Sequence, residues 1–271
     1  SIGPEGVSIV ISIRAEGNIV LGNYSVERRN TMCNEIRKIV DRNNHSVNTS
    51  INMDSKKEIV KLIQNMSGRV SPYNIFSDWI EISALAIQNA CYLVHNSLWQ
   101  KREDQYKAVI NKYTAEEQNK LVDMFNLLWI AFEEKASDIL GEIYMESGCG
   151  NKNTGQFFTP YHLSLVTAEL AIPDDYDGSY KLSFNEPSTG GGGMMIAASQ
   201  VLKNRGFNYQ KCMKVVCQDL DWKGVYMTYI QLSILGIDAI VVQGDTLCDP
   251  YREGYPAERV FRTPKNMGVI L

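Results

Sequence analysis

Four consecutive glycines, Gly190 to Gly193, separate a short apolar run ending at Asn185-Glu186-Pro187 from a helix-forming segment that begins at Met194. Glycine permits a tight turn and lets a ligand approach the backbone closely. A strand, a glycine turn and a helix N-terminus together suit a nucleotide-like ligand, because unpaired N–H groups and the helix dipole face the bound group. Glycine runs also serve as flexible linkers, so the turn taken alone leaves both interpretations open.

The segments around the glycines alternate between the two kinds of secondary structure. Apolar runs predict strands at 181–185, 213–218 and 238–243, and longer apolar-patterned segments predict helices at 193–203 and 223–235. This alternation indicates a parallel sheet with right-handed crossovers. Ligands of such sheets bind beyond the carboxyl ends of the strands. We therefore expect the glycine turn, Asp219 with Asp221, and Asp245 to face one crevice.

The chain before residue 148 has a different character. Alternating apolar residues from Val7 onward predict a β-hairpin over about 7–26, and the segment from Arg28 to Arg42 is the most basic of the chain. This basic segment is either a solvated helix face or a nucleic-acid contact. Helices are expected at 55–66, from 77 to about 107, and from 114 to about 147, the last opened by a Thr114–Glu117 capping box.

Composition narrows the class of protein. The chain has 271 residues and a net charge of −4, so no global basic field attracts nucleic acid. Its six cysteines show no C-x-x-C spacing and it has three histidines, which makes a zinc site improbable. No signal peptide or bilayer-length apolar run is recognised. We therefore expect a cytoplasmic protein with reduced thiols, no metal and no membrane association.

Four motifs in chain order resemble the adenine-specific (N6) DNA methyltransferases, and most closely the modification subunits of type I restriction-modification systems. The first runs from Gly155 to Pro160, with the sequence GQFFTP, and the second is EPSTGGG from Glu186 to Gly192. Gln218-Asp219 resembles the ribose-binding acid of the family. Gly244-Asp245-Thr246-Leu247 resembles its G-D-[ST]-L motif. The resemblance covers about residues 139 to 248, and Glu186 replaces the family's usual aspartate.

The resemblance implies S-adenosyl-L-methionine as cofactor and DNA as substrate. The sulfonium cofactor has no phosphate, so a glycine turn without a neighbouring lysine or arginine suits it better than it suits ATP. On this basis the cofactor-binding residues are predicted to be Phe157, Phe158, Thr159, Glu186, Pro187, Ser188, Gly190, Gly192, Asp219 and Asp245. Asp219 lies 29 residues after Gly190 (219 minus 190), beyond the roughly 20 of the NAD fingerprint.

The chain departs from the family at the catalytic step. Adenine methylation uses a [DN]-P-P-[FYW] clamp that holds the flipped base by hydrogen bonds and ring stacking, and no such tetrapeptide occurs here. Three explanations stay open: a degenerate methyltransferase, one half of a split enzyme, or a rearranged clamp. The residues for the rearranged clamp would be Asp249, Pro250 and Tyr251. A further strand is expected at 268–271.

The sequence thus predicts an α/β fold, a shortened class I (Rossmann-like) methyltransferase sheet preceded by a helical region and an N-terminal β-hairpin. The expected domains are a hairpin with a basic helix (1–53), a helical region (54–147) and a cofactor-binding domain (148–271). The edge left open by the short sheet could be covered by the hairpin or by a second subunit. The alternative to an enzyme is a non-catalytic regulatory or interaction module that acts with DNA or a partner subunit, and a homo-oligomer is possible.

Overall fold

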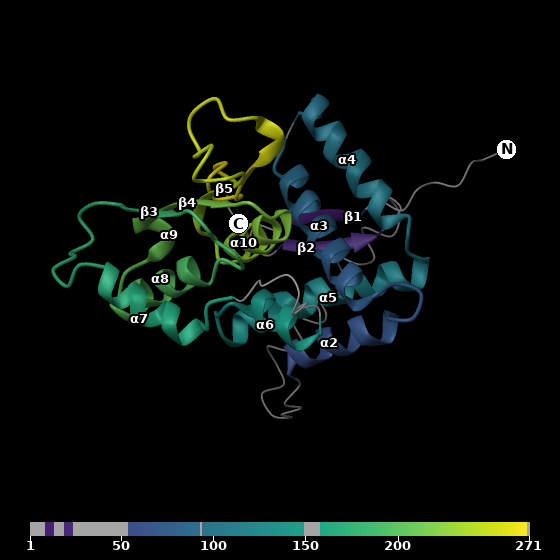
Figure 1. Ribbon diagram of the computed structural model, residues 1–271. Helices are drawn as coiled ribbons and strands as arrows, with labels where there is room; N and C mark the ends of the chain where they lie inside the picture. The colour runs from purple at the N-terminus through teal and green to yellow at the C-terminus, as the bar shows by residue number, and fades with distance from the viewer. Residues whose placement is uncertain (1–8, 14–18, 24–53, 93, 149–157, 270–271) are drawn as a thin grey trace.

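The computed structural model of the chain describes residues 9–13, 19–23, 54–92, 94–148 and 158–269. Its centre is a four-stranded sheet in the order β3-β4-β5-β6, with β3 spanning Leu182–Glu186, β4 Met213–Asp219, β5 Asp238–Gln243 and β6 Val260–Arg262. The first three strands are parallel, and β6 pairs antiparallel with β5. The predicted α/β class and the shortened Rossmann-like sheet are confirmed (Figure 1).

Two crossover helices, α8 (Gly193–Asn204) and α10 (Trp222–Ile234), connect the parallel strands and pack on one face of the sheet. On that face Val215 and Cys217 of β4 are fully buried in the main core. On the other face Ile240 and Val242 of β5 join a small separate cluster with Tyr255. Alternate strand residues thus enter two cores of unequal size, as the two-residue period of a strand requires.

The helical region consists of α2 (Ser55–Met66), α3 (Pro72–Ala90), α4 (Ser97–Ile110), α5 (Ala115–Glu134) and α6 (Ile139–Glu146). The helix at 55–66 and its Asp54 cap are confirmed, and so is the Thr114–Glu117 capping box. Two predicted continuous helices are wrong, because each is broken into two. Asn96 starts α4 and Asp138 starts α6, since each side chain accepts a hydrogen bond from a backbone N–H of the first turn.

Helix α7 (Tyr161–Ala171) packs beside α8, and the short helix α9 (Tyr209–Cys212) leads directly into β4. A single turn of 3-10 helix, Ala257–Arg259, precedes β6. Helix α10 packs against α3, so one continuous hydrophobic core joins the helical region to the sheet. None of the helices in the described ranges has the length and apolar character needed to cross a membrane.

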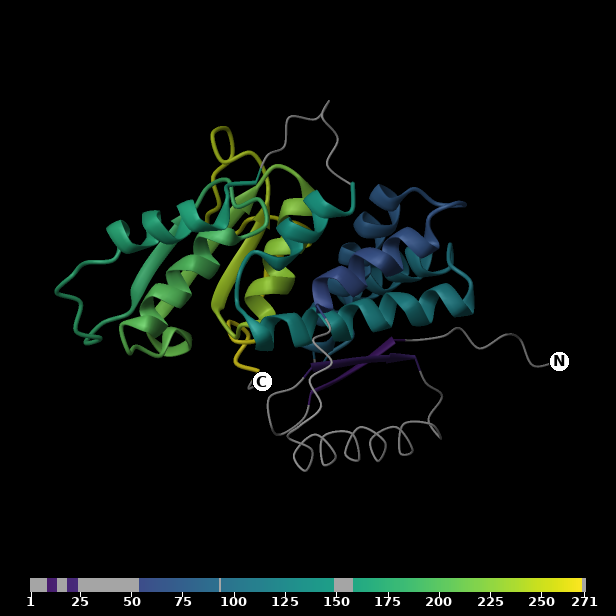
Figure 2. The ribbon, with the colours of Figure 1, turned by 90° about the horizontal axis from the view of Figure 1, so that it is seen from below.

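The predicted hairpin forms, with β1 (Ile9–Ile13) antiparallel to β2 (Ile19–Asn23). Strand β1 lies beside α3 and β2 beside α5, as a sheet of its own. Figure 2 shows this purple hairpin below the helices and apart from the β3 edge. The hairpin therefore does not cover the open edge, contrary to one of the two expectations. The basic segment from Arg28 to Arg42 lies outside the described residues.

The fourth strand is not where the sequence predicts it. Residues 260–262 form β6, whereas Gly268 and Val269 belong to no strand, and 270–271 lie outside the described residues. The Thr263 hydroxyl fixes the end of β6, because it donates to the Ile237 carbonyl at 2.7 Å and accepts from the Ala239 N–H at 3.0 Å. A three-residue strand is too short to produce a recognisable alternation in the sequence.

Candidate functional site

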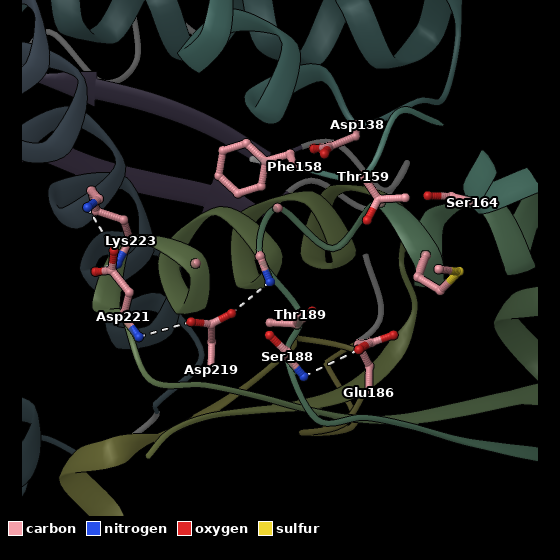
Figure 3. Close-up of a pocket in the computed structure, with 15 residues that line it drawn as sticks. Asp138, Phe158, Thr159, Ser164, Glu186, Ser188, Thr189, Asp219, Asp221 and Lys223 are labelled. Atoms are coloured by element: carbon pink, nitrogen blue, oxygen red, sulfur yellow. Dashed lines mark hydrogen bonds and ion pairs between the residues drawn. The ribbon is translucent and has the colours of Figure 1, made fainter. Parts of the chain in front are cut away.

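A cavity of about 290 Å³ lies beyond the carboxyl ends of β3 and β4. The glycine turn forms its floor, and the start of α6, the segment before α7 and the start of α10 form its walls (Figure 3). The lining residues are Asp138, Phe158, Thr159, Ser164, Glu186, Ser188, Thr189, Gly190, Gly191, Gly193, Met194, Asp219, Asp221, Lys223 and Gly224. This is the end of the sheet at which an open α/β fold binds its ligand.

The glycine turn needs glycine at defined positions. Gly190 has φ +53° and Gly192, the residue that precedes α8, has φ +88°, both in the left-handed region. A Cβ added at Gly190 would also lie 3.1 Å from the Phe158 ring. The Gly192 N–H donates to the Thr189 carbonyl at 2.8 Å, which closes the turn. The turn is therefore an ordered structure and not a flexible tether.

Asp219 at the end of β4 holds the turn from below. Its Oδ2 accepts from the Gly190 N–H at 2.7 Å, and its Oδ1 accepts from the Asp221 N–H at 2.9 Å (Figure 3). A carboxylate can accept about four hydrogen bonds, so Asp219 keeps capacity for a hydroxyl-bearing ligand. Gly224 in α10 gives this carboxylate its space, because a Cβ there would lie 2.8 Å from the Asp219 Cγ.

Asp138 holds the turn from the opposite side, and it is only 5 % exposed. Its Oδ1 accepts from the Gly141 N–H at 3.0 Å and from the Gln231 Nε2 at 2.9 Å. A Cβ at Gly191 would lie 2.5 Å from the same oxygen, so the carboxyl group packs directly on the glycine turn. Burial raises the pKa of Asp138, because desolvation disfavours the charged form more than the hydrogen bonds favour it.

An aromatic series connects the cavity with the helical core. The Phe158 ring stands edge-on to Tyr144 of α6 at 5.4 Å, and Tyr144 contacts Phe76 of α3 at 5.4 Å. Tyr144 and Phe76 are buried, whereas Phe158 is partly exposed to the cavity. Helices far upstream in the sequence therefore position the ring that covers the glycine turn.

The charges around the cavity are predominantly negative. Glu186 ends β3, and burial raises the pKa of its carboxyl group although the Ser188 N–H donates to it at 3.3 Å. Asp221 pairs with Lys223 at 2.7 Å, and the Lys223 ammonium also donates to the Tyr73 hydroxyl at 3.0 Å. The one amine on the lining is thus already engaged with protein groups. Such a site favours a cationic ligand over a phosphate.

Six of the ten predicted cofactor residues line the cavity: Phe158, Thr159, Glu186, Ser188, Gly190 and Asp219. Pro187, Gly192 and Asp245 do not line it, and Phe157 lies outside the described residues. Asp245 is close in the fold, because the Gly244 N–H donates to the Asp219 carbonyl and the Thr246 hydroxyl donates to the Pro187 carbonyl. The Asp245 carboxylate accepts from the Leu247 and Cys248 N–H groups, as a turn-forming aspartate does.

The tripeptide Asp249-Pro250-Tyr251 is held on the Gln218 side chain. The Gln218 Nε2 donates to the Asp249 carbonyl at 2.9 Å, and the Tyr251 N–H donates to the Gln218 Oε1 at 2.9 Å. The Asp249 carboxylate pairs with Arg252, and the Tyr251 ring packs on the cluster of Tyr255. None of the three residues lines the cavity. Their predicted role as a clamp remains a prediction.

Sequence reasoning did not place Asp138, Ser164, Met194 or Lys223 at the site. The signal for Asp138 was available, because an aspartate three residues before Gly141 suits a helix N-cap. The prediction of one uninterrupted helix through this point concealed it. Ser164 and Met194 carry no signal of their own, since the packing of α7 on α8 brings them to the cavity. Among the described residues, no group of His, Cys, Asp and Glu side chains could hold a metal ion.

Comparison with known proteins gives a family match over the same part of the chain. Residues 135–269 match the family model for N-6 DNA methylases. No curated protein matches the sequence. The solved structures that resemble it include the methyltransferase subunit of a type I restriction-modification system from Streptococcus thermophilus, with 17 % identity and a TM-score of 0.41 over 71 % of this chain and 44 % of that one.

A putative class I S-adenosylmethionine-dependent methyltransferase from Listeria monocytogenes is similar at 9 % identity, with a TM-score of 0.40 over 72 % of this chain and 55 % of that one. The matched part of each protein is thus about half of its length. The family match begins at residue 135, close to Asp138, and includes every residue that lines the cavity. Residues 135–269, and with them the glycine turn and its cavity, belong to the N-6 DNA methylase family.

Proposed function

We propose that the cavity at the glycine turn binds S-adenosyl-L-methionine and that the chain acts in adenine-N6 methylation of DNA. One observation carries the proposal: the carboxyl groups of Asp138, Glu186, Asp219 and Asp221 surround an ordered glycine turn. The single amine on the cavity lining, that of Lys223, already forms an ion pair with Asp221. This surrounding suits a nucleoside that carries a sulfonium and an ammonium group. It disfavours polyphosphates, whose charge would meet four acids.

The residues present fit the parts of the cofactor. Asp219 has acceptor capacity left for ribose hydroxyls, Glu186 can pair with the ammonium group of the methionine part, and Phe158 covers the turn. The bound cofactor supplies an electrophilic methyl group on its sulfonium. Asp245 and Leu247 lie on the turn after β5 and do not line the cavity. We propose that they contact the adenine ring of the cofactor where it extends beyond the cavity. Leu247 is 95 % exposed and Leu220, which follows Asp219, is 68 % exposed, as apolar contacts for a flat base would be before it binds.

Methyl transfer to adenine needs a clamp for the flipped base. The N-P-P-F tetrapeptide that forms this clamp does not occur in the 271 residues, and no part of such a clamp lines the described cavity. We therefore propose that clamp and DNA-recognition groups come from outside these residues, from a partner subunit or a further part of the enzyme. Strand β3 has β4 as its single neighbour among the described strands, which leaves its other edge open for such an addition.

Isothermal titration calorimetry with S-adenosylmethionine and S-adenosylhomocysteine tests the cofactor proposal. Saturable binding should weaken by about 10- to 150-fold in Asp219→Asn, the loss of a charge-assisted hydrogen bond of about 1.5–3 kcal/mol. Asp175→Asn is the matched control, since this exposed carboxylate lies in the loop after α7, away from the cavity. Absence of binding heat at high protein concentration would refute the cofactor site.

Tritiated methyl transfer to mixed duplex DNA separates the enzyme from a non-catalytic module. Transfer by the chain alone that is lost in Asp249→Ala would support Asp249-Pro250-Tyr251 as a rearranged clamp. Transfer that appears only when a subunit carrying N-P-P-F is added would support the split enzyme. Cofactor binding without methyl transfer, both by the chain alone and with the added subunit, would favour the regulatory module.

A further inference from the structure

A second cavity, of about 430 Å³, lies between helices α3, α4 and α10 and strand β6. Its volume falls within the range of about 300–1,000 Å³ that small-molecule sites occupy. The first turn of α10 separates it from the glycine-turn cavity, because Trp222 lines this cavity while Asp221 and Lys223 line the other. The yellow segment that contains β6 lies close to α3 and α4 in Figure 1. No part of the proposed cofactor chemistry uses this second cavity.

Four charged residues line the cavity, Glu81, Lys101, Arg102 and Glu258, and Arg102 is the one among them that is buried. Glu81 accepts a hydrogen bond from Gln105, and neither glutamate forms an ion pair with Arg102 within the described residues. Arg102 of α4 is 4 % exposed, and its Nη1 has no hydrogen-bond partner within the described ranges. Its Nη2 reaches the Val260 carbonyl at 3.5 Å, a long and weak contact.

Within α4, Lys107 pairs with Glu103, and Arg102 takes no part in that ion pair. Burial of a charge without a counter-charge is energetically costly. An anionic ligand that enters the cavity would therefore be stabilised by pairing with the Arg102 guanidinium.

Aromatic rings form the surface next to Arg102. Trp222 and Tyr226 stack at 5.3 Å with an interplanar angle of 27°, and Phe261 stands edge-on to both. The Arg102 guanidinium lies over the Phe261 ring at 5.5 Å and over the Tyr92 ring at 5.2 Å. A flat ligand ring placed against this wall would have stacking partners on one side and a guanidinium at its edge.

We propose that this cavity binds an aromatic anion, a flat ring system that carries a carboxylate or a phosphate monoester. The oxyanion pairs with Arg102, whose planar fork of donors matches either group. The ring packs against the aromatic wall formed by Trp222, Tyr226 and Phe261. This proposal does not depend on the identity of the ligand at the glycine turn.

If the role of Arg102 were only structural, to join α4 to β6, the expected results would differ. In that case the nearly isosteric, uncharged Arg102→Met would lower stability, and no added anion would change it. For an anion site, Arg102→Met leaves the stability without ligand equal or higher, because it removes an unpaired buried charge. The same substitution then abolishes stabilisation by ligand. Thermal unfolding with and without ligand reads both effects.

The experiment uses the full chain with two anions and their neutral counterparts. Indole-3-acetate and indole-3-acetamide test the carboxylate, while phenyl phosphate and phenol test the phosphate monoester. We expect one or both anions to bind in calorimetry, with the matching neutral compound and Arg102→Met about tenfold weaker or worse. Lys107→Met is the control, because it removes an exposed cation of the same helix outside the cavity.

Two further variants locate the bound anion. Binding of phenyl phosphate, which lacks the indole chromophore, should change the fluorescence of Trp222, so Trp222→Phe should lose this change while the other three tryptophans remain. Asp219→Asn should bind the anion normally, which separates this site from the glycine turn. Equal affinity for anion and neutral compound would overturn the proposal, and so would unchanged binding in Arg102→Met. If Arg102→Met does not fold, the comparison of anion with neutral compound in the natural chain decides by itself.

Discussion

The side-chain amide of Gln231 donates to the Asp138 Oδ1 at 2.9 Å and to the Gly191 carbonyl at 2.5 Å, and so ties the start of α6 to the glycine turn. Its Oε1 accepts from the Leu140 N–H at 3.0 Å, and the residue is fully buried. One side chain of α10 thus satisfies three groups from two other segments.

Replacement of Gln231 by leucine should destabilise the chain by about 2–5 kcal/mol, because it removes one hydrogen bond each from the buried Asp138 carboxyl group, the Gly191 carbonyl and the Leu140 N–H. Urea unfolding measures this. Gln100→Leu, at an exposed glutamine of α4 that bonds Asp104, is the control and should change stability by about 0.5 kcal/mol or less. Equal effects of the two substitutions would contradict the role given to Gln231.

Asp138 should make the folded state less stable as pH rises. Burial raises the pKa of its carboxyl group above the ordinary 3.8, so between 3.8 and the folded pKa the folded state keeps a proton that the unfolded state has released. Stability therefore falls with rising pH across that window, and the full cost is present above it. Asp138→Asn cannot titrate, so its stability relative to the natural chain should improve as pH rises from about 4 to about 7. Parallel urea-unfolding curves at all pH values would be inconsistent with this account.

Gly224 should not tolerate alanine, although alanine is normally the better helix former by about 1 kcal/mol. The added Cβ would lie 2.8 Å from the Asp219 Cγ and 3.1 Å from the Gly190 carbonyl oxygen. We expect a loss of about 1–3 kcal/mol in unfolding free energy. The double variant Gly224→Ala with Asp219→Ala should regain part of that stability but should not regain cofactor binding. A double variant that is worse than the sum of the two single changes would exclude the steric explanation.

Glu186 should make cofactor affinity depend on pH. Burial raises the pKa of its carboxyl group above the ordinary 4.5, and the ionised form is the one that pairs with an ammonium group. Affinity for S-adenosylmethionine should therefore fall as pH decreases through that raised pKa. Glu186→Gln should weaken binding by about tenfold at neutral pH and should remove this part of the pH dependence. Calorimetric titrations over a pH series check both, and a pH dependence retained in Glu186→Gln would assign it to another group.

The motifs near the sheet were predictable because their signals are local. The strand ends at Glu186 and Asp219 and the glycine turn between them follow from short-range patterns, since apolar runs, glycines and acids occur in the order that a crossover imposes. The Thr114–Glu117 capping box is equally local. By contrast, β6 was missed because its position depends on the distant Ile237 and Ala239 backbone, to which Thr263 bonds.

The sequence by itself determined the α/β class, the order of its parallel strands and the family motifs, because each depends on residues that are neighbours along the chain. The tertiary structure decided which side chains meet at the cavity. Asp138, Phe158 and Lys223 come from three different elements, and packing of buried groups such as Tyr144 and Gln231 brings them together. The break before α6, the separate position of the hairpin and the uncompensated charge of Arg102 were also decided there, since burial depends on contacts between residues far apart in sequence.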